Sequence, residues 1–149
     1  MTAYYFAMMG IDINIRDKKL SSPLHWAAFS ASESALGYIL ALDPDVNVQD
    51  YDGLTPLHLA IRSAEELRST RMVKHLLIRG ASRDIRDNNG RLPADVADEI
   101  SFPELREEIK DILEPPSALV ELFMIRTPMK KLNPSLRPII LYIILVSFV

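Results

Sequence analysis

The sequence Ser22-Pro23-Leu24-His25 recurs as Thr55-Pro56-Leu57-His58, and the two blocks lie 33 residues apart. Only the first residue differs, and serine and threonine both carry a hydroxyl group. Self-similarity at a fixed period of about 20–50 residues is the signature of repeat proteins, in which stacked neighbours bury a shared core. The spacing therefore predicts a stack of similar units and favours a binding surface over a catalytic site.

The match extends well beyond these two blocks. Residues 12–17 (DINIRD) match residues 45–50 (DVNVQD) at the same spacing, and residues 82–87 (SRDIRD) begin a third copy. In that third copy Pro93 lies 37 residues after Pro56, so the second unit carries four extra residues. We place this insertion within residues 63–71, where the paired helices of the second unit turn back.

Each unit carries the signals of a helix pair. In the second unit Gly53 suits a turn that requires positive φ. Thr55 can cap the following helix, Pro56 fits its first turn, and Gly80 ends the second helix. The apolar positions of the two helices are Leu57, Ala60, Ile61, Met72, Val73, Leu76 and Leu77. The pattern predicts an all-α fold of helix-turn-helix pairs joined by extended turns.

The other units depart from this pattern at defined places. Leu20 occupies the position of the turn glycine, which implies a changed or strained turn. Asp43-Pro44 stands where the second unit has Gly80-Ala81. In the closing unit Ser101 and Glu104 have the spacing of a capping box, which predicts a helix start there.

These motifs resemble ankyrin repeats, through TPLHLA at residues 55–60, SPLHWA at 22–27 and RLPADVA at 91–97. The resemblance implies an ankyrin-repeat solenoid whose stability comes from contacts between neighbouring units. We expect a half repeat at 1–16, repeats at about 17–49 and 50–86, and a closing repeat at 87–114. The chain then begins in the middle of a repeat.

The C-terminal part has a different character. After a basic and apolar linker at 115–138, residues 139–149 are almost entirely apolar. We expect a truncated transmembrane-type helix there, although eleven residues fall short of the roughly 20 that span a bilayer. The alternative is a short C-terminal core helix. The basic residues that flank this segment are Lys130, Lys131 and Arg137, which favours membrane localisation with the repeats on the cytosolic side.

A narrower resemblance is to the ankyrin-bearing DHHC-type protein S-acyltransferases (palmitoyltransferases). It rests on PLHWA at 23–27, on a long turn from Ser69 to Leu77, and on the closing repeat ahead of a basic-flanked apolar segment. It implies a region that recruits protein substrates for S-palmitoylation, with the catalytic domain absent from this chain. The alternatives are a regulatory ankyrin domain of a channel or other membrane protein, and a soluble ankyrin adaptor.

The chemistry-bearing residues do not indicate an active site. His25 and His58 occupy the same repeat position, and the ankyrin resemblance implies that they hydrogen-bond turn backbone and link neighbouring repeats. The chain has no cysteine and three histidines, which is a poor set for zinc, and we expect no metal and no cofactor. A net charge of −3 without a basic face argues against nucleic acid as a partner.

A protein or peptide ligand is the expected partner, bound on the concave and turn-tip face, and the C-terminal segment is expected to contact the membrane. Trp26 aligns with Leu59, which favours core packing, but Phe29 aligns with Arg62 at a position that ankyrin repeats usually expose. Trp26, Phe29 and Tyr51 would then form an aromatic anchor for an extended peptide. The full candidate surface comprises Lys18, Lys19, Trp26, Phe29, Tyr51, Asp52, Arg62, Asn88 and Asn89.

Overall fold

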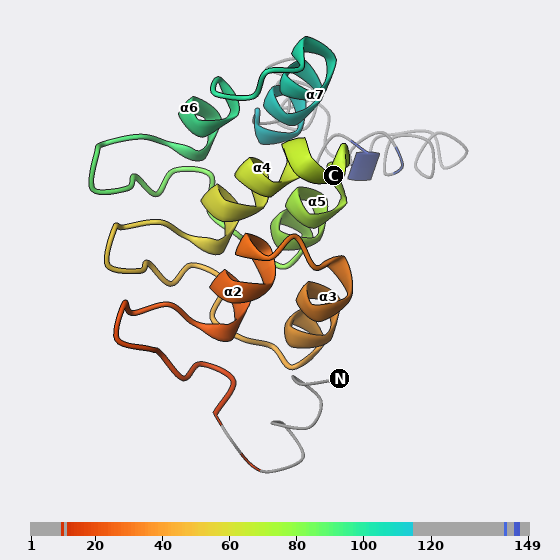
Figure 1. Ribbon diagram of the computed structural model, residues 1–149. Helices are drawn as coiled ribbons and strands as arrows, with labels where there is room; N and C mark the ends of the chain where they lie inside the picture. Colours follow the sequence, from red (N-terminus) through yellow and green to blue (C-terminus); the bar gives the residue numbers. More distant parts are fainter. Residues whose placement is uncertain (1–9, 11, 115–141, 143–144, 147–149) are drawn as a thin grey trace, which may run out of the picture.

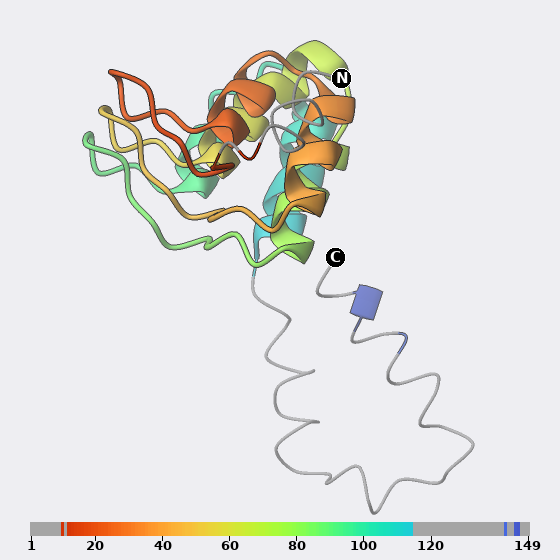
Figure 2. The same ribbon diagram turned by 90° about the horizontal axis from the view of Figure 1, so that it is seen from below.

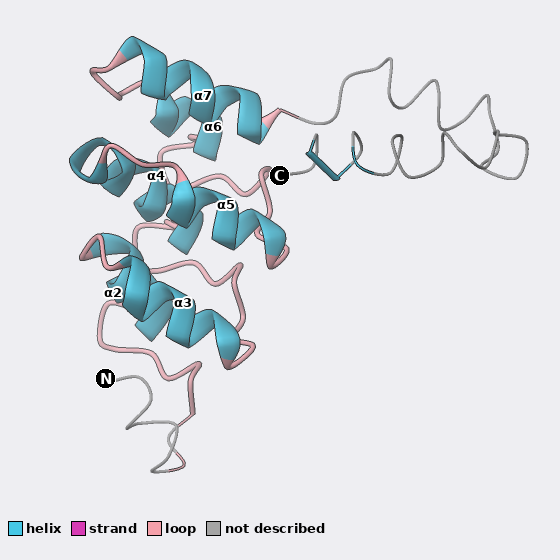
Figure 3. Cartoon of the chain, turned by 90° about the vertical axis from the view of Figure 1, so that its right-hand side faces the viewer, coloured by secondary structure: helices cyan, strands magenta, loops and turns pink. Residues whose placement is uncertain are grey.

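The computed structural model describes residues 10, 12–114, 142 and 145–146. Within residues 12–114 the chain forms helices joined by extended loops, without a strand (Figure 3). The helices are α2 (Pro23–Phe29), α3 (Glu33–Ala41), α4 (Pro56–Leu67), α5 (Arg71–Ile78), α6 (Pro93–Ala97) and α7 (Pro103–Leu113). The expected all-α fold of helix pairs joined by extended turns is confirmed.

The helices form two stacked layers. α4 packs between α2 and α6 in one layer, while α3 packs on α5 in the other, and α7 continues that second layer above α5 (Figure 1). Each pair, α2 with α3, α4 with α5 and α6 with α7, is one antiparallel unit. The long loops that precede α2, α4 and α6 project together from one side of the stack (Figures 1 and 2). We call these loops the fingers.

We call α2, α4 and α6 the inner helices, and α3, α5 and α7 the outer helices. A short local sequence determines where each inner helix begins. The Ser22 side chain accepts a hydrogen bond from the His25 amide at the start of α2, and Thr55 does the same for His58 at the start of α4. A proline follows each cap, where a missing N–H leaves nothing unpaired. In the closing unit the residue before Pro93 is Leu92, which has no hydroxyl group to cap α6. There the Asp95 carboxylate accepts a hydrogen bond from the Leu92 amide at 2.8 Å.

The core lies between the two layers and continues from unit to unit. Its largest fully buried apolar side chains are Leu24, Leu36, Leu57, Ile61, Met72, Leu76, Ile109, Val73 and Val96. Each unit contributes to this set, so the apolar face of one helix pair is covered by the next pair. The apolar positions expected for the second unit are all buried.

Two turn positions that recur between units have a left-handed backbone. Leu20 has φ 59°, in the same conformation as its equivalents Gly53 at 75° and Gly90 at 77°. The strained turn expected at Leu20 is therefore confirmed, because a side chain with a Cβ is disfavoured there. Asp43 has φ 54° at the position that Gly80 occupies with φ 90°, and aspartate tolerates this region better than most residues.

Three details of the sequence interpretation need correction. The insertion does not lengthen a turn: it gives α4 12 residues against 7 in α2. Ser69–Leu77 is not a long turn, because α5 begins at Arg71 and runs through most of it. Ser101 does not cap α7, which begins at Pro103 after Phe102. Its amide instead donates to the Glu65 carboxylate at 3.1 Å.

The expectations for the two ends of the chain fall mostly outside the described residues. This applies to the start of the half repeat, to the linker at 115–138 with Lys130, Lys131 and Arg137, and to most of residues 139–149. Among the described residues, no helix combines the length and the apolar character that crossing a membrane requires.

Candidate functional site

The two repeated histidines join neighbouring units. His25 is 1% exposed; its Nδ1 accepts the Ser22 amide hydrogen at 3.1 Å, and its Nε2 lies 2.9 Å from the Leu54 carbonyl oxygen in the next finger. Because Nδ1 is an acceptor, the single proton of the neutral ring is on Nε2, which donates to that carbonyl. His58 repeats the arrangement, with Nε2 at 3.2 Å from the Arg91 carbonyl oxygen.

Burial explains the charge state of both rings. Removal from water lowers the pKa of His25 and of His58 below the ordinary value, although the hydrogen bonds to the Leu54 and Arg91 carbonyl groups oppose that shift. Both rings are therefore neutral near pH 7 and act as structural donors. The expected role of these histidines as links between units is confirmed.

A second set of side chains joins the fingers to one another. Arg16 donates to the Leu20 carbonyl oxygen of its own finger at 2.7 Å and to the Gln49 carbonyl oxygen of the next finger. Gln49 repeats this with Gly53 and Arg86, each at 2.9 Å. The fingers are therefore a hydrogen-bonded row rather than three independent loops, and they can hold side chains at their tips in fixed positions.

One aspartate shapes the tip of each finger. A single carboxylate oxygen of Asp17, Asp50 and Asp87 accepts two backbone amide hydrogens of its own turn, at 2.9 Å each. Turn capping therefore accounts for these acids. The second oxygen of Asp17 and that of Asp87 each bind a side chain, and that side chain differs between the two units.

In the first unit this partner is Trp26. The indole N–H donates to Asp17 at 2.9 Å, and the ring remains 52% exposed. The Ser21 backbone amide and this indole hydrogen bond together lower the pKa of the Asp17 carboxyl group. The interpretation of Trp26 as a core residue is wrong: its aligned partner Leu59 is 8% exposed, while Trp26 is turned outward and held by the finger.

Phe29 completes an aromatic pair on the same face. It is 64% exposed, and its ring meets the Trp26 ring edge to face, with 5.9 Å between the centroids and an interplanar angle of 84°. This is a favourable aromatic geometry. We call the exposed side of α2, α4 and α6 together with the finger tips the finger face; within it the Asp17–Trp26 bond joins the first finger to α2.

The other members of the candidate surface divide between two places. Lys18 and Lys19 lie exposed at the first fingertip, and Tyr51 is 72% exposed at the second. The Tyr51 amide donates to the Lys19 carbonyl oxygen at 2.8 Å, which fixes the two tips together. In the described part of the chain, however, ring contacts join only Trp26 and Phe29, so the expected three-ring cluster is reduced to a pair.

The remaining candidates line a polar groove between the second and third fingers. The groove has a volume of about 250 Å³ and is lined by Asp52, Leu54, Arg62, Asp87, Asn88, Asn89 and Arg91. Asn88 donates to the Tyr51 carbonyl oxygen at 2.8 Å, so its side chain is part of the groove wall. The finger face thus combines an aromatic patch on the first unit with a polar groove one unit away.

Arg91 was not predicted as part of this surface. Its guanidinium group donates to Asp87 at 2.8–2.9 Å and pairs with Glu99 at 2.5 Å. Burial alone raises the pKa of Asp87, but the hydrogen bonds from Arg91 and Asn89 outweigh it and lower the pKa. The repeat of aspartate at positions 17, 50 and 87 was the signal available in the sequence for these tip contacts.

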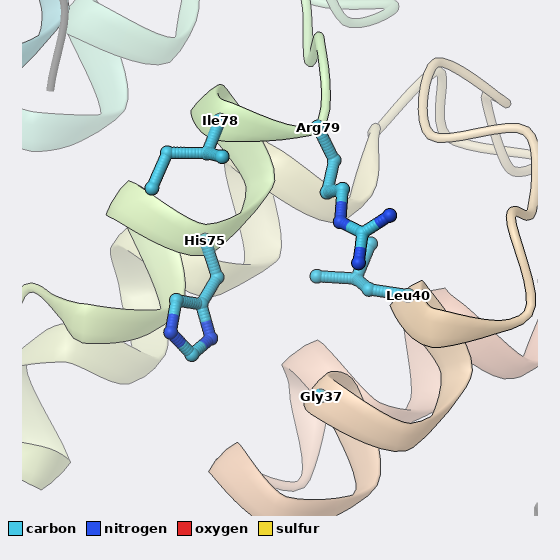
Figure 4. Close-up of a pocket in the computed structure, with 5 residues that line it drawn as sticks. All are labelled: Gly37, Leu40, His75, Ile78 and Arg79. Atoms are coloured by element: carbon cyan, nitrogen blue, oxygen red, sulfur yellow. The ribbon is translucent and has the colours of Figure 1, made fainter. Parts of the chain in front are cut away.

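A second, shallower hollow lies on the opposite side, between the outer helices. Gly37 and Leu40 of α3 face His75 and Ile78 of α5 across about 150 Å³, with Arg79 at the end (Figure 4). Gly37 has no Cβ, and apart from its chain neighbours and the nearby backbone of α3 no heavy atom lies within 4 Å of where one would be. The outer hollow lacks a polar network like that of the fingers, so it serves below as the control face.

A family model described as ankyrin repeats, in three copies, matches residues 2–89, which is more than half of the chain. No curated protein matches the chain.

Proposed function

The chain belongs to the ankyrin-repeat family, a generic protein–protein interaction module, and from that premise we propose that its finger face binds an extended peptide segment of a partner protein. The premise gives the class of partner. It does not give the surface, since ankyrin folds present variable side chains on a common scaffold. The surface is argued from the residues below.

The observation that carries the proposal is the exposed pair of Trp26 and Phe29. A half-exposed tryptophan beside an exposed phenylalanine leaves apolar area in water, and burial of such area contributes about 25 cal/mol per Å². The Asp17 hydrogen bond fixes the indole before any ligand arrives, so less side-chain freedom is lost on binding. Aromatic anchors of this kind dominate binding energies at interfaces.

The test uses the full chain and peptides selected on it from a random twelve-residue display library. Trp26 is the one tryptophan of the chain, so its fluorescence reports binding directly. We expect Phe29→Ala to weaken the selected peptides at least tenfold, because a hot-spot truncation costs more than about 1.4 kcal/mol.

The matched control is Tyr38→Ala, since Tyr38 is 54% exposed and belongs to the outer helix α3, which is not part of the finger face. It should leave the affinity unchanged. Unchanged affinity in Phe29→Ala, with unchanged thermal stability, would remove the finger face as the binding surface.

For the cellular role we propose substrate recruitment for protein S-palmitoylation, on the cytosolic side of a membrane protein. What supports it is sequence: PLHWA at residues 23–27, and the basic residues ahead of the apolar segment 139–149. In this role the peptide on the finger face belongs to a substrate, and catalysis belongs to a separate cysteine-rich domain.

Sequencing the transcript beyond the codon of Val149 tests this role. A downstream Asp-His-His-Cys motif in a cysteine-rich stretch is the expected result. A channel pore would instead indicate the regulatory alternative, and an immediate stop codon would indicate the adaptor.

A further inference from the structure

Arg62 stands out on the finger face as a cation without a carboxylate partner. In residues 12–114 it makes neither an ion pair nor a side-chain hydrogen bond, and its side chain is exposed along the polar groove. The other cation of the groove, Arg91, is already held by Asp87 and Glu99. An incoming anion would therefore find one available guanidinium group, that of Arg62.

The surroundings favour a carboxylate carried by a peptide over a free anion. Asp52 also lines the groove and repels any anion, so a carboxylate is held there more readily when the rest of its peptide makes further contacts beside it. Asn89, exposed at the third fingertip, can instead donate to and accept from a peptide backbone. Arginine holds a carboxylate through two parallel hydrogen bonds, which fixes orientation as well as charge.

Arg62 and Phe29 occupy equivalent positions on neighbouring inner helices. α2 and α4 pack directly on one another, and packed helices lie about 8–10 Å apart. One peptide in an extended conformation can therefore reach both residues. The distance also limits which of its side chains can do so.

We compare this general helix separation with the side-chain spacing of extended backbones. In polyproline II each residue advances about 3.1 Å with three residues per turn, so side chains at i and i+3 share a face about 9 Å apart. In a β-strand the same-face neighbours at i+2 and i+4 lie about 7 and 13 Å apart, and neither matches the helix separation. The i, i+3 pair fits both the distance and the face.

We propose that the finger face recognises a polyproline II segment with an apolar side chain and a carboxylate three residues apart, the first against Trp26 and Phe29 and the second on Arg62. This proposal rests on the function proposed above and adds the chemistry of the ligand. Selectivity then comes from two neighbouring units, because neither unit carries both anchors.

The first experiment is a selection of random twelve-residue peptides on the full chain. The expected consensus is an aromatic or aliphatic residue with aspartate or glutamate three positions away. A consensus with the acid two positions away, or with no acid, would overturn the proposal while leaving peptide binding intact.

The second experiment reverses the charges. A selected peptide is compared with its Asp→Asn and Asp→Lys versions on the unmodified chain, on Arg62→Glu and on the control Arg79→Glu. Arg79 is a suitable control because it is exposed and lines the outer hollow. Tryptophan fluorescence measures the affinity, and melting curves confirm that each variant is folded.

The unmodified chain should bind the Asp peptide at least tenfold tighter than the Asn peptide. Arg62→Glu should lose that preference and favour the Lys peptide, while Arg79→Glu should behave like the unmodified chain. Equal effects of the two substitutions would overturn the role of Arg62, even if Phe29→Ala abolishes binding. Failure to enrich any peptide would overturn the proposed function itself.

Discussion

The first and second units share a scaffold and differ on its surface. Both begin the inner helix with a hydroxyl residue, a proline, a leucine and a buried histidine, and both histidines bind the next finger. Three and six positions after the proline of α2, however, Trp26 and Phe29 face outward, whereas the equivalent residues of α4 are the buried Leu59 and the charged Arg62. In these two units the positions that join neighbours are therefore the same, whereas the exposed positions of the inner helices differ.

The largest expected effect concerns the shared core. Leu24 and Leu57 are equivalent and almost completely buried, so replacement of either by alanine should destabilise the fold by about 2–5 kcal/mol. Leu57→Ala should cost the more of the two, because α4 packs between α2 and α6. Urea denaturation of the two variants measures the difference. A loss below 1 kcal/mol for Leu57→Ala would contradict a shared core.

The buried histidines should come next. Replacement of His58 by alanine leaves the Thr55 amide and the Arg91 carbonyl group without their partners, which costs about 1–3 kcal/mol. His25→Ala should cost a similar amount, because its contacts are the same. His75→Ala is the control, since His75 is exposed on α5. A small loss for His58 alone would show that the two units are not equivalent.

The same histidines predict a dependence of stability on pH. Because burial lowers the pKa of His25 and His58 in the folded state, the unfolded chain takes up protons first as the pH falls. The free energy of unfolding should thus be constant above pH 7 and should fall below about pH 6.5, the unfolded value. Denaturation curves between pH 7.5 and 5 check this. The His25→Ala, His58→Ala double variant should lose most of the slope in that window.

The turn position shared by Leu20 and Gly53 should respond in opposite directions. Gly53→Ala should destabilise by about 1–2 kcal/mol or more, because φ is 75° and the new Cβ would lie 2.5 Å from the Asn88 side-chain oxygen. Leu20→Gly should stabilise by about 0.5–1 kcal/mol, because it relieves the left-handed strain. Thermal melting measures both changes. Destabilisation by Leu20→Gly would mean that contacts of the leucine outweigh its strain.

The smallest effect is expected at Gly37, in the middle of α3. An alanine there fits without contact and should stabilise the helix by about 0.5–1 kcal/mol. Peptide binding on the finger face should not change. A loss of affinity in Gly37→Ala would show that the outer hollow also takes part in binding.

The repeat pattern predicted most of the scaffold, since the helix caps, the turn glycines and the buried stripes recur at fixed spacing. The incorrect predictions concern helix boundaries, which the local sequence alone did not determine. Ser101-Phe102-Pro103 contains two possible starts for α7, and the proline, which fits the first helical position, decided in favour of Phe102 as the cap.

The candidate surface was predictable by position but not by orientation. Trp26 aligns with a buried leucine, and only the geometry of the first finger shows Asp17 within reach of the indole N–H. Tyr51 is a residue type that often serves as an anchor, but its position at the tip of the second finger separates its ring from those of Trp26 and Phe29. Contacts between a loop and a helix depend on three-dimensional positions that repeat spacing does not encode.

One set of side-chain hydrogen bonds between units runs in a single direction along the chain. Arg16, His25, Gln49 and His58 each donate to backbone carbonyl groups of the following unit. During synthesis on the ribosome, each emerging segment therefore meets a preceding unit whose donors are already in place. The chain can be completed one unit at a time, with each finished unit serving as the template for the next.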